Sequence, residues 1–179
     1  MADIMPLENL GPRIVIMGPT NAGKSTLCKA ISAKLHLPPV YLDQLHHQPN
    51  TDWVARPKAE FHGLQRDAIA QETWIMDGNY SGLIAERLAR ATGAILVDEH
   101  YTLRFARYIR RTLFERHRPG SLAGAQDSLK WSMIHWIWKT RNSYDRYHAM
   151  VAPSGLPLVT CRSLRQVNRL YDAWGLDGP

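Results

Sequence analysis

Residues 18–25 read Gly-Pro-Thr-Asn-Ala-Gly-Lys-Ser, which fills every fixed position of the pattern G-x-x-x-x-G-K-[ST]. Residues 13–17 (RIVIM), immediately before, form a run rich in β-branched residues, and residues 24–35 carry apolar residues at helical spacing. A buried strand, a glycine-containing turn and a helix N-terminus are the setting in which this pattern binds phosphate groups. Residues 18–25 therefore predict a phosphate-binding loop, called the phosphate loop below.

The residue types in the phosphate loop each have a chemical reason. Gly18 and Gly23 allow backbone amides to approach a phosphate closely, and the positive end of the following helix adds to the attraction. Lys24 can bridge β- and γ-phosphate oxygens, the Ser25 hydroxyl is the expected magnesium ligand, and Thr26 is expected at the α-phosphate. The predicted ligands are ATP and Mg²⁺. The predicted ATP-binding residues of this segment are Gly18, Pro19, Thr20, Asn21, Ala22, Gly23, Lys24, Ser25 and Thr26.

The rest of the chain alternates short apolar runs with helical patterns. The predicted strands are residues 13–17, 40–42, 73–76, 94–97 and 157–160. The predicted helices outside the long segment discussed next are residues 24–35, 56–71, 81–91 and 163–174. This alternation predicts an α/β fold with a parallel sheet and right-handed crossovers.

Two long helical stretches, residues 102–115 and 127–150, lie between the fourth and fifth predicted strands. The connector between them, RHRPGSLAGAQ, contains Gly, Pro and Ser. We interpret residues 102–150 as a lid within a single domain that spans residues 1–179, not as a second domain. Its aromatic second helix predicts core packing or a dimer face, so both a monomer and a homodimer remain open.

Charge and composition limit the classes of partner. The 179 residues include 22 Lys and Arg against 16 Asp and Glu, for a net charge of +6, and the excess lies mainly between Arg104 and Arg146. Such an excess suits nucleic acid, an anionic surface or a phosphate-rich small ligand. No apolar run reaches the roughly 18 residues that span a membrane, and the first residues do not resemble a secretion signal. A cytoplasmic protein is predicted, with Cys28 and Cys161 as reduced core thiols.

Five segments resemble one known family. They are GPTNAGKST at 18–26, YLDQLHHQPNTDW at 41–53, WIMDGNY at 74–80, the pair Arg107 and Arg111, and LVTCRS at 158–163. The chain is similar to small P-loop nucleoside-monophosphate-kinase-like proteins, and within them to the adenylate-kinase-related group called DNA topology modulation proteins. The resemblance implies a three-layer P-loop NTPase fold, with a five-stranded parallel sheet of order 2-3-1-4-5 and helices on both faces. It also implies an acceptor-binding region at about residues 43–72 and an Arg-rich lid that closes over ATP.

Three carboxylates follow predicted strands, at the edge where an open parallel sheet binds ligands. Asp43 is expected to bind or deprotonate an acceptor hydroxyl, or to hold a magnesium-bound water; the alternative is a helix N-cap. Asp77 and Asp98 could each support magnesium. We favour Asp77 as the metal residue and expect Asp98 to cap the helix that enters the lid.

The arginines of the lid are the predicted cationic groups of the site. Arg107 and Arg111 lie four residues apart on one helical face and are expected to reach the transferring phosphoryl group, with Arg107 also contacting ATP. The alternative is a solvated helix face or a nucleic-acid patch. Other arginines expected to take part are Arg104, Arg110, Arg116 and Arg118.

The acceptor pocket is expected after the second and third strands, with His46 among its walls. The predicted substrate-binding residues are Asp43, His47, Trp53, Gly78, Asn79, Tyr80 and Arg111. Adenylate kinases carry Phe-Pro-Arg where this chain has Asn79-Tyr80, so the resemblance does not supply their AMP-binding arginine and AMP is disfavoured. The resemblance further implies main-chain contact between Arg162 and the adenine ring, and we expect Ser163 to cap the last helix.

Two functions remain open on this basis. The first is transfer of the γ-phosphoryl group of MgATP to a small nucleotide or other hydroxyl- or phosphate-bearing acceptor. The second is a DNA-associated ATP-binding protein or ATPase, which the net charge of +6 and the family's name suggest.

Overall fold

The β-branched and apolar runs of the chain form one parallel sheet. The computed structural model describes residues 4–114, 120–122 and 129–178. Its strands are β1 (Arg13–Met17), β2 (Pro39–Tyr41), β3 (Trp74–Asp77), β4 (Gly93–Val97) and β5 (Leu158–Cys161). They pair in parallel in the order β2-β3-β1-β4-β5, which confirms the predicted fold class and strand order.

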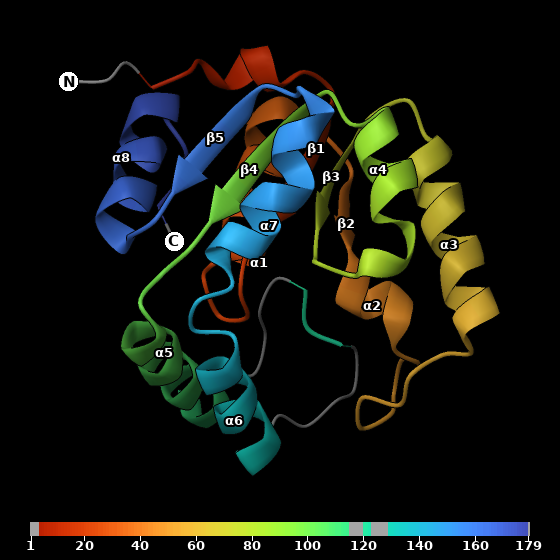
Figure 1. Cartoon of the computed structure of the whole chain (residues 1–179), viewed down its shortest axis with the longest axis vertical. Helices are drawn as coiled ribbons and strands as arrows, with labels where there is room; N and C mark the ends of the chain where they lie inside the picture. Colours follow the sequence, from red (N-terminus) through yellow and green to blue (C-terminus); the bar gives the residue numbers. More distant parts are fainter. Residues whose placement is uncertain (1–3, 115–119, 123–128, 179) are drawn as a thin grey trace.

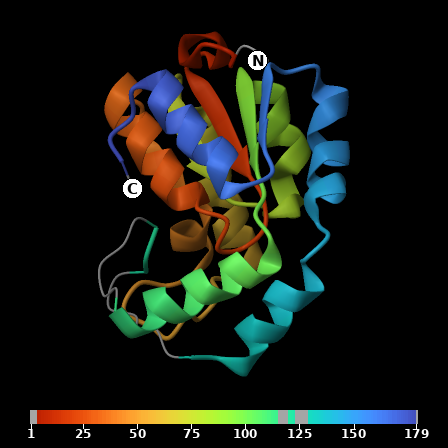
Figure 2. The same ribbon diagram turned by 90° about the vertical axis from the view of Figure 1, so that its left-hand side faces the viewer.

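Helices cover both faces of the sheet, as the crossover rule requires. Their bounds are α1 (Lys24–Leu35), α2 (Leu42–His46), α3 (Lys58–Ala70), α4 (Ile84–Arg90), α5 (Tyr101–Phe114), α6 (Trp131–Lys139), α7 (Tyr144–Val151) and α8 (Leu164–Trp174), with short 3₁₀ turns η1 (Leu7–Leu10), η2 (Ser81–Leu83) and η3 (Ala152–Ser154). Helices α1 and α8 pack on one face, and α3, α4 and α7 on the other (Figures 1 and 2).

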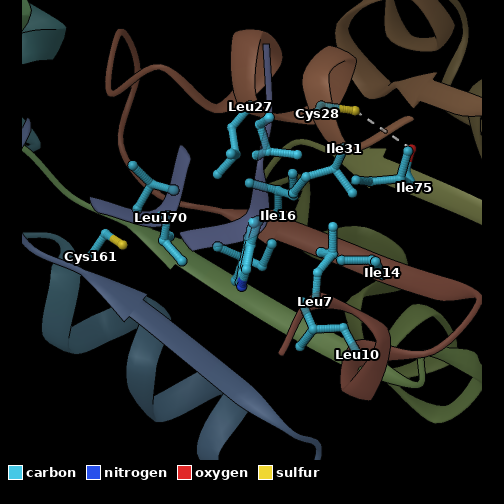
Figure 3. Close-up of a cluster of buried hydrophobic side chains, with 14 of the residues drawn as sticks. Leu7, Leu10, Ile14, Ile16, Leu27, Cys28, Ile31, Ile75, Cys161 and Leu170 are labelled. Atoms are coloured by element: carbon cyan, nitrogen blue, oxygen red, sulfur yellow. Dashed lines mark hydrogen bonds between the residues drawn. The ribbon is translucent and has the colours of Figure 1, made fainter. Parts of the chain in front are cut away.

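Alternation along the central strand divides the core into two clusters. Ile14 and Ile16 point to the α1 and α8 side, whereas Val15 and Met17 point to the opposite side, because successive strand residues face opposite ways. Figure 3 shows the first cluster, in which Cys28 Sγ donates to the carbonyl oxygen of Ile75 over 3.7 Å. Burial raises the pKa of the Cys28 thiol well above its ordinary value. Cys28 is a free, buried thiol, which confirms the predicted core cysteine.

Two element predictions need correction. The second strand ends at Tyr41, and Leu42 opens α2, a short helix that the sequence analysis did not predict. The single helix predicted over 127–150 is also wrong, because α6 ends at Lys139 and α7 begins at Tyr144. Ser143 Oγ donates to the Thr140 carbonyl over 2.9 Å, so a side chain satisfies a backbone acceptor where the helix stops.

The carboxyl ends of the strands all meet at one edge, and α5 and α6 lie beyond that edge in both views (Figures 1 and 2). The phosphate loop, α2, Gly78 and the approach to α5 each follow a strand directly at this edge. Ligands of open parallel sheets bind there. Among the described residues, no helix combines the length and apolar character needed to cross a bilayer.

Candidate active site

The phosphate loop joins β1 to α1 through backbone shapes that favour glycine. Gly18 has φ +146° and Gly23 has φ +92°, and a Cβ on Gly18 would lie 1.8 Å from the Val97 carbonyl oxygen. Gly23 is the N-cap of α1 and supplies no side chain to the first amides of the helix. Those amides therefore retain the partial positive charge that binds phosphate at a helix N-terminus.

The predicted metal residues lie in direct contact. Ser25 Oγ donates to Asp77 Oδ2 over 2.5 Å, and the other carboxylate oxygen of Asp77 is buried without a hydrogen-bond partner in the described part of the chain. Burial raises the pKa of Asp77, and this effect is opposed by nearby Lys24 and by the Ser25 hydrogen bond. A hydroxyl and a carboxylate are the hard oxygen donors that Mg²⁺ prefers. Ser25 and Asp77 thus fit the ion.

Magnesium usually keeps several waters and shares its remaining positions with substrate phosphates. Across residues 4–114, 120–122 and 129–178 there is no cluster of three or more His, Cys, Asp or Glu residues that could hold an ion alone. The two oxygen donors of Ser25 and Asp77 are consistent with a magnesium ion that water and substrate phosphates also coordinate. Asp98 is placed differently, because its Oδ1 accepts from the Glu99 amide over 2.9 Å, before α5 begins. It orders that turn, so the predicted helix cap at Asp98 is wrong.

Lys24 and Arg107 both donate to backbone carbonyls of the phosphate loop. Lys24 Nζ donates to the Pro19 carbonyl over 3.0 Å, so its ammonium group lies against the loop. Arg107 donates from Nη1 to the Asn21 carbonyl over 2.7 Å, which brings α5 down onto the same loop. Asn21 itself has φ +63°, and both polar atoms of its buried side chain have no hydrogen-bond partner among the residues that the structure describes. These groups therefore lie along the phosphate loop, the predicted binding site for polyphosphate.

Arg104, one turn before Arg107, joins two separate segments of the chain through its hydrogen bonds. Its side chain is fully buried, and Nε donates to the Thr20 carbonyl over 2.8 Å. The other end of the guanidinium donates to the carbonyl and hydroxyl oxygens of Thr140, over 3.1 Å and 2.8 Å. Arg104 therefore ties the phosphate loop to the turn between α6 and α7. Arg111 lies half-buried on α5, while Arg116 and Arg118 lie outside the described residues.

Asp43 and Tyr80 meet at the ends of β2 and β3. The Tyr80 hydroxyl donates to Asp43 Oδ1 over 2.8 Å. Burial and the neighbouring Asp43 charge raise the pKa of Tyr80, so the phenol stays a proton donor. The N-cap of α2 is Tyr41, with Asp43 inside the first turn, so the N-cap alternative for Asp43 is wrong. The carboxylate is free of a capping role and is oriented by Tyr80.

Aromatic rings surround this pair. His46 stacks on Tyr80 with ring centroids 4.6 Å apart, and Phe61 packs edge-on against His46 at 4.9 Å. His47 approaches the Asp43 carbonyl through Nδ1 at 2.9 Å and contacts the Trp53 ring at 5.1 Å. The structure thus brings His47 and Trp53 together beside Asp43, where the acceptor pocket was expected.

Gly78 and Asn79, at the end of β3, lie close to α2 and to the phosphate loop. Gly78 has φ +138°, and a Cβ there would lie 2.8 Å from Leu42 Cβ, so this glycine lets β3 and α2 approach. The Asn79 side chain turns toward the phosphate loop and hydrogen-bonds to both backbone groups of Gly18. The predicted substrate contacts of Gly78 and Asn79 remain predictions, and no sequence pattern indicated this bond to the loop.

Arg162 lies just after β5. Its backbone amide donates to Gln166 Oε1 over 2.6 Å, and its guanidinium stacks on the Tyr144 ring with a separation of 4.5 Å. Ser163 accepts from the Gln166 amide through its hydroxyl, so the predicted cap of α8 is confirmed. The adenine contact expected of Arg162 stays a prediction.

Arg87, a buried residue that was not predicted from the sequence, is only 1% exposed. Burial lowers its pKa to about 10, against the attraction of Asp77. One Nη donates weakly to the Tyr80 carbonyl at 3.4 Å, and the other is buried without a hydrogen-bond partner in the described structure. The helical spacing offered a signal, because Arg87 lies one turn after Leu83 and Ile84 on the apolar side of α4.

The segment 120–122 of the predicted lid also reaches this edge. A Cβ on Gly120 would lie 3.3 Å from Ser25 Oγ and 3.1 Å from the Tyr41 ring. Gln44 of α2 donates to the Ser121 carbonyl over 2.9 Å. Residues 120–122 therefore lie beside Ser25, the residue that contacts Asp77.

The same fold occurs in solved structures of kinases. A "putative kinase" from Chloroflexus aurantiacus J-10-fl is 17% identical with a TM-score of 0.54, over 90% of this chain and 95% of that chain. Shikimate kinase from Bacteroides thetaiotaomicron is 20% identical with a TM-score of 0.50, over 92% of this chain and 99% of that chain. The chain has the fold of the P-loop kinases. No family model and no curated protein matches its sequence.

Proposed function

We propose that the protein is a P-loop phosphotransferase that moves the γ-phosphoryl group of MgATP to a small hydroxyl- or phosphate-bearing acceptor. The observation that carries this proposal is the 2.5 Å contact between Ser25 and Asp77 at the foot of the phosphate loop. A hydroxyl from the loop and a carboxylate from the neighbouring strand form the magnesium-binding pair of P-loop enzymes. The kinase fold of the neighbours adds support, and the particular family group remains the adenylate-kinase-related one proposed from the motifs.

In the proposed reaction, the phosphate loop holds the nucleotide and the α2 side holds the acceptor. Backbone amides of residues 18–25 and Lys24 bind the β- and γ-phosphates, while Ser25 and Asp77 hold magnesium, which offsets phosphate charge. Arg107 lies close enough to the loop to stabilise charge on the transferring group. Arg111 and the adenine contact at Arg162 complete the proposed nucleotide and acceptor contacts.

Asp43 is the proposed base for a hydroxyl acceptor. It would take the hydroxyl proton as the acceptor oxygen bonds to the γ-phosphorus and the bond to the bridging oxygen of ADP breaks. Tyr80 fixes one carboxylate oxygen of Asp43 at 2.8 Å and leaves the other for this transfer. His47 and Trp53 are proposed as walls that position the acceptor and exclude water.

Residues 102–150 are proposed to act as a lid within one domain, in a cytoplasmic monomer or homodimer. The DNA-associated alternative is the weaker proposal, because only the net charge of +6 and the name of the resembling family suggest it. Arg104 and Arg107, which begin the basic stretch, donate to the phosphate loop, so part of that charge already serves the proposed nucleotide site.

A screen of ATP consumption tests the proposal. Nucleoside monophosphates, nucleosides, shikimate and small alcohols would each be added to the protein with MgATP, with Lys24→Ala as control. We expect consumption to rise with one class of acceptor and to be lost in Lys24→Ala. Equal consumption with every acceptor and with none would contradict a kinase. DNA binding that weakens steeply with salt, without acceptor phosphorylation, would favour the alternative.

A further inference from the structure

The Asn79 side chain binds both backbone groups of the first phosphate-loop residue. Asn79 Oδ1 accepts from the Gly18 amide over 3.0 Å, and Asn79 Nδ2 donates to the Gly18 carbonyl over 2.5 Å. An amide side chain carries a donor and an acceptor in one plane, so it can make both bonds at once. The contact joins residues 61 positions apart in the chain.

This pair continues the hydrogen bonding of the sheet beyond the ends of its strands. The last regular β1 and β3 partners are Ile16 and Asp77, and the Gly78 amide still donates to the Ile16 carbonyl over 3.3 Å. At Gly18 the backbone turns to φ +146°. The amide of Asn79 meets the two Gly18 groups there in place of a backbone partner.

Gly18 is confined from the other side as well. A Cβ at this position would overlap the Val97 carbonyl of β4, at 1.8 Å. The first residue of the loop therefore lies between the ends of β3 and β4 and contacts both. Since the Gly18 carbonyl belongs to the peptide bond with Pro19, holding it also fixes the plane of that peptide. The next carbonyl along, that of Pro19, is the group that Lys24 Nζ contacts.

We propose that Asn79 is a positioning residue for the phosphate loop, one that sets MgATP affinity by holding Gly18 and, through Pro19, the approach of Lys24. This inference depends on the proposed function for its ligand. It departs from the substrate-contact role predicted for Asn79, because it places the effect on the nucleotide and not on the acceptor. A loop held in its binding shape loses less conformational freedom when it binds.

The first test needs no ligand. Hydrogen exchange at the Gly18 amide would be followed by NMR in the wild type, Asn79→Asp and Asn79→Ala. Asn79→Asp keeps the size of the side chain but sets a carboxylate oxygen against the Gly18 carbonyl, and Asn79→Ala removes both bonds. We expect exchange to become at least about tenfold faster in Asn79→Ala, as the loss of one net hydrogen bond implies. We expect the same in Asn79→Asp, because repulsion between the carboxylate and the Gly18 carbonyl displaces the side chain from both Gly18 groups. Unchanged exchange would overturn the proposal.

The second test measures binding of MgATP by calorimetry in the same proteins, with the exposed Asn168→Ala on α8 as matched control. We expect the Kd to rise about tenfold in both Asn79 variants and to stay within twofold in the control. An unchanged Kd, with a shift only in melting temperature or in the acceptor KM, would overturn the inference and favour a structural or substrate role. Absence of MgATP binding in the wild type would overturn the proposed function. The exchange test would still show whether Asn79 holds the Gly18 backbone. If Asn79→Ala does not fold, both measurements are made on the isosteric Asn79→Asp.

Discussion

The Tyr80 hydroxyl orients the Asp43 carboxylate, the proposed base, and removing that single oxygen atom tests this role. Tyr80→Phe removes the hydroxyl that donates to Asp43 over 2.8 Å and keeps the ring stacked on His46. We expect kcat/KM for the acceptor to fall about tenfold, because a hydrogen bond to a charged group is lost. MgATP affinity should stay unchanged, as measured by calorimetry. Equal losses in both quantities would contradict a role confined to Asp43.

His46 gives the fold a pH-dependent contribution. Burial and the neighbouring His47 lower the pKa of His46, against the attraction of Asp43. The unfolded chain therefore binds the proton more readily, so this stabilisation is complete above the unfolded pKa of about 6.5 and is lost as the pH falls below it. His46→Phe keeps a ring beside Tyr80 but cannot titrate.

The measurement is urea unfolding of the wild type and His46→Phe at pH 7.5 and pH 5.5. We expect the free energy of unfolding to fall less in His46→Phe than in the wild type between these two pH values. Identical pH dependence in the two proteins would show that His46 contributes nothing to it.

Residues that carry clear chemical signals were predictable, and residues with roles set by packing were not. Ser25 came from the motif, and Asp77 from its position at the end of an apolar strand; the structure brings the two together. Asn79 carried no signal for its bond to Gly18, because that contact depends on how far β1 and β3 extend. Arg104 was expected among the lid arginines, yet its burial against Thr140 depends on where α6 ends.

At the scale of elements, the turn from β1 into α1 depends on the lack of a side chain at Gly18. Gly18→Ala would force a Cβ into the Val97 carbonyl and impose a positive φ on alanine. We expect the free energy of unfolding to fall by at least about 2 kcal/mol, from overpacking and backbone strain. Gly63→Ala is the matched control, since Gly63 lies within α3 and a Cβ there would meet no described atom within 4 Å. It should stabilise the protein by about 0.5–1 kcal/mol. Urea unfolding measures both, and a similar loss in the two variants would contradict this account.

Arg104 links three elements, and its loss should be costly. Arg104→Ala removes three hydrogen bonds from a fully buried group and leaves carbonyls of Thr20 and Thr140 without this donor. We expect a loss of about 3 kcal/mol in the free energy of unfolding. Arg104→Lys should not restore it, because one ammonium group cannot reach both threonines as the guanidinium fork does. The exposed Arg169→Ala on α8 is the control, with an expected change within about 0.5 kcal/mol. If Arg104→Lys had the wild-type free energy of unfolding, the proposed link between Thr20 and Thr140 through Arg104 would be contradicted.

The elements themselves were largely predictable, because buried strands and helices carry periodic apolar residues. β4, buried along its whole length, was predicted as residues 94–97 and is Gly93–Val97. The break between α6 and α7 was not predictable from periodicity, since both helices carry apolar residues at helical spacing. It is fixed by hydrogen bonds to Thr140 from Ser143 and Arg104.

At the scale of the whole molecule, two segments near the middle of the predicted lid contact the predicted acceptor region. Lys130 pairs with Asp52 over 2.8 Å, and Gln44 donates to Ser121 over 2.9 Å. Both contacts join the predicted lid to the predicted acceptor region, across the edge where β1 and β3 end. Both regions were predicted from the sequence, but the contacts between them depend on the fold. These contacts support the proposal that residues 102–150 act as a lid.

The central claim is that the phosphate loop binds MgATP through Lys24 and the pair of Ser25 and Asp77. The most direct measurement is isothermal titration calorimetry with ATP, at two temperatures, with magnesium and with EDTA. We predict saturable binding of one ATP per chain that weakens at least about tenfold in Lys24→Ala and on removal of magnesium. No heat of binding at either temperature, or equal affinity in the wild type and Lys24→Ala, would contradict the account.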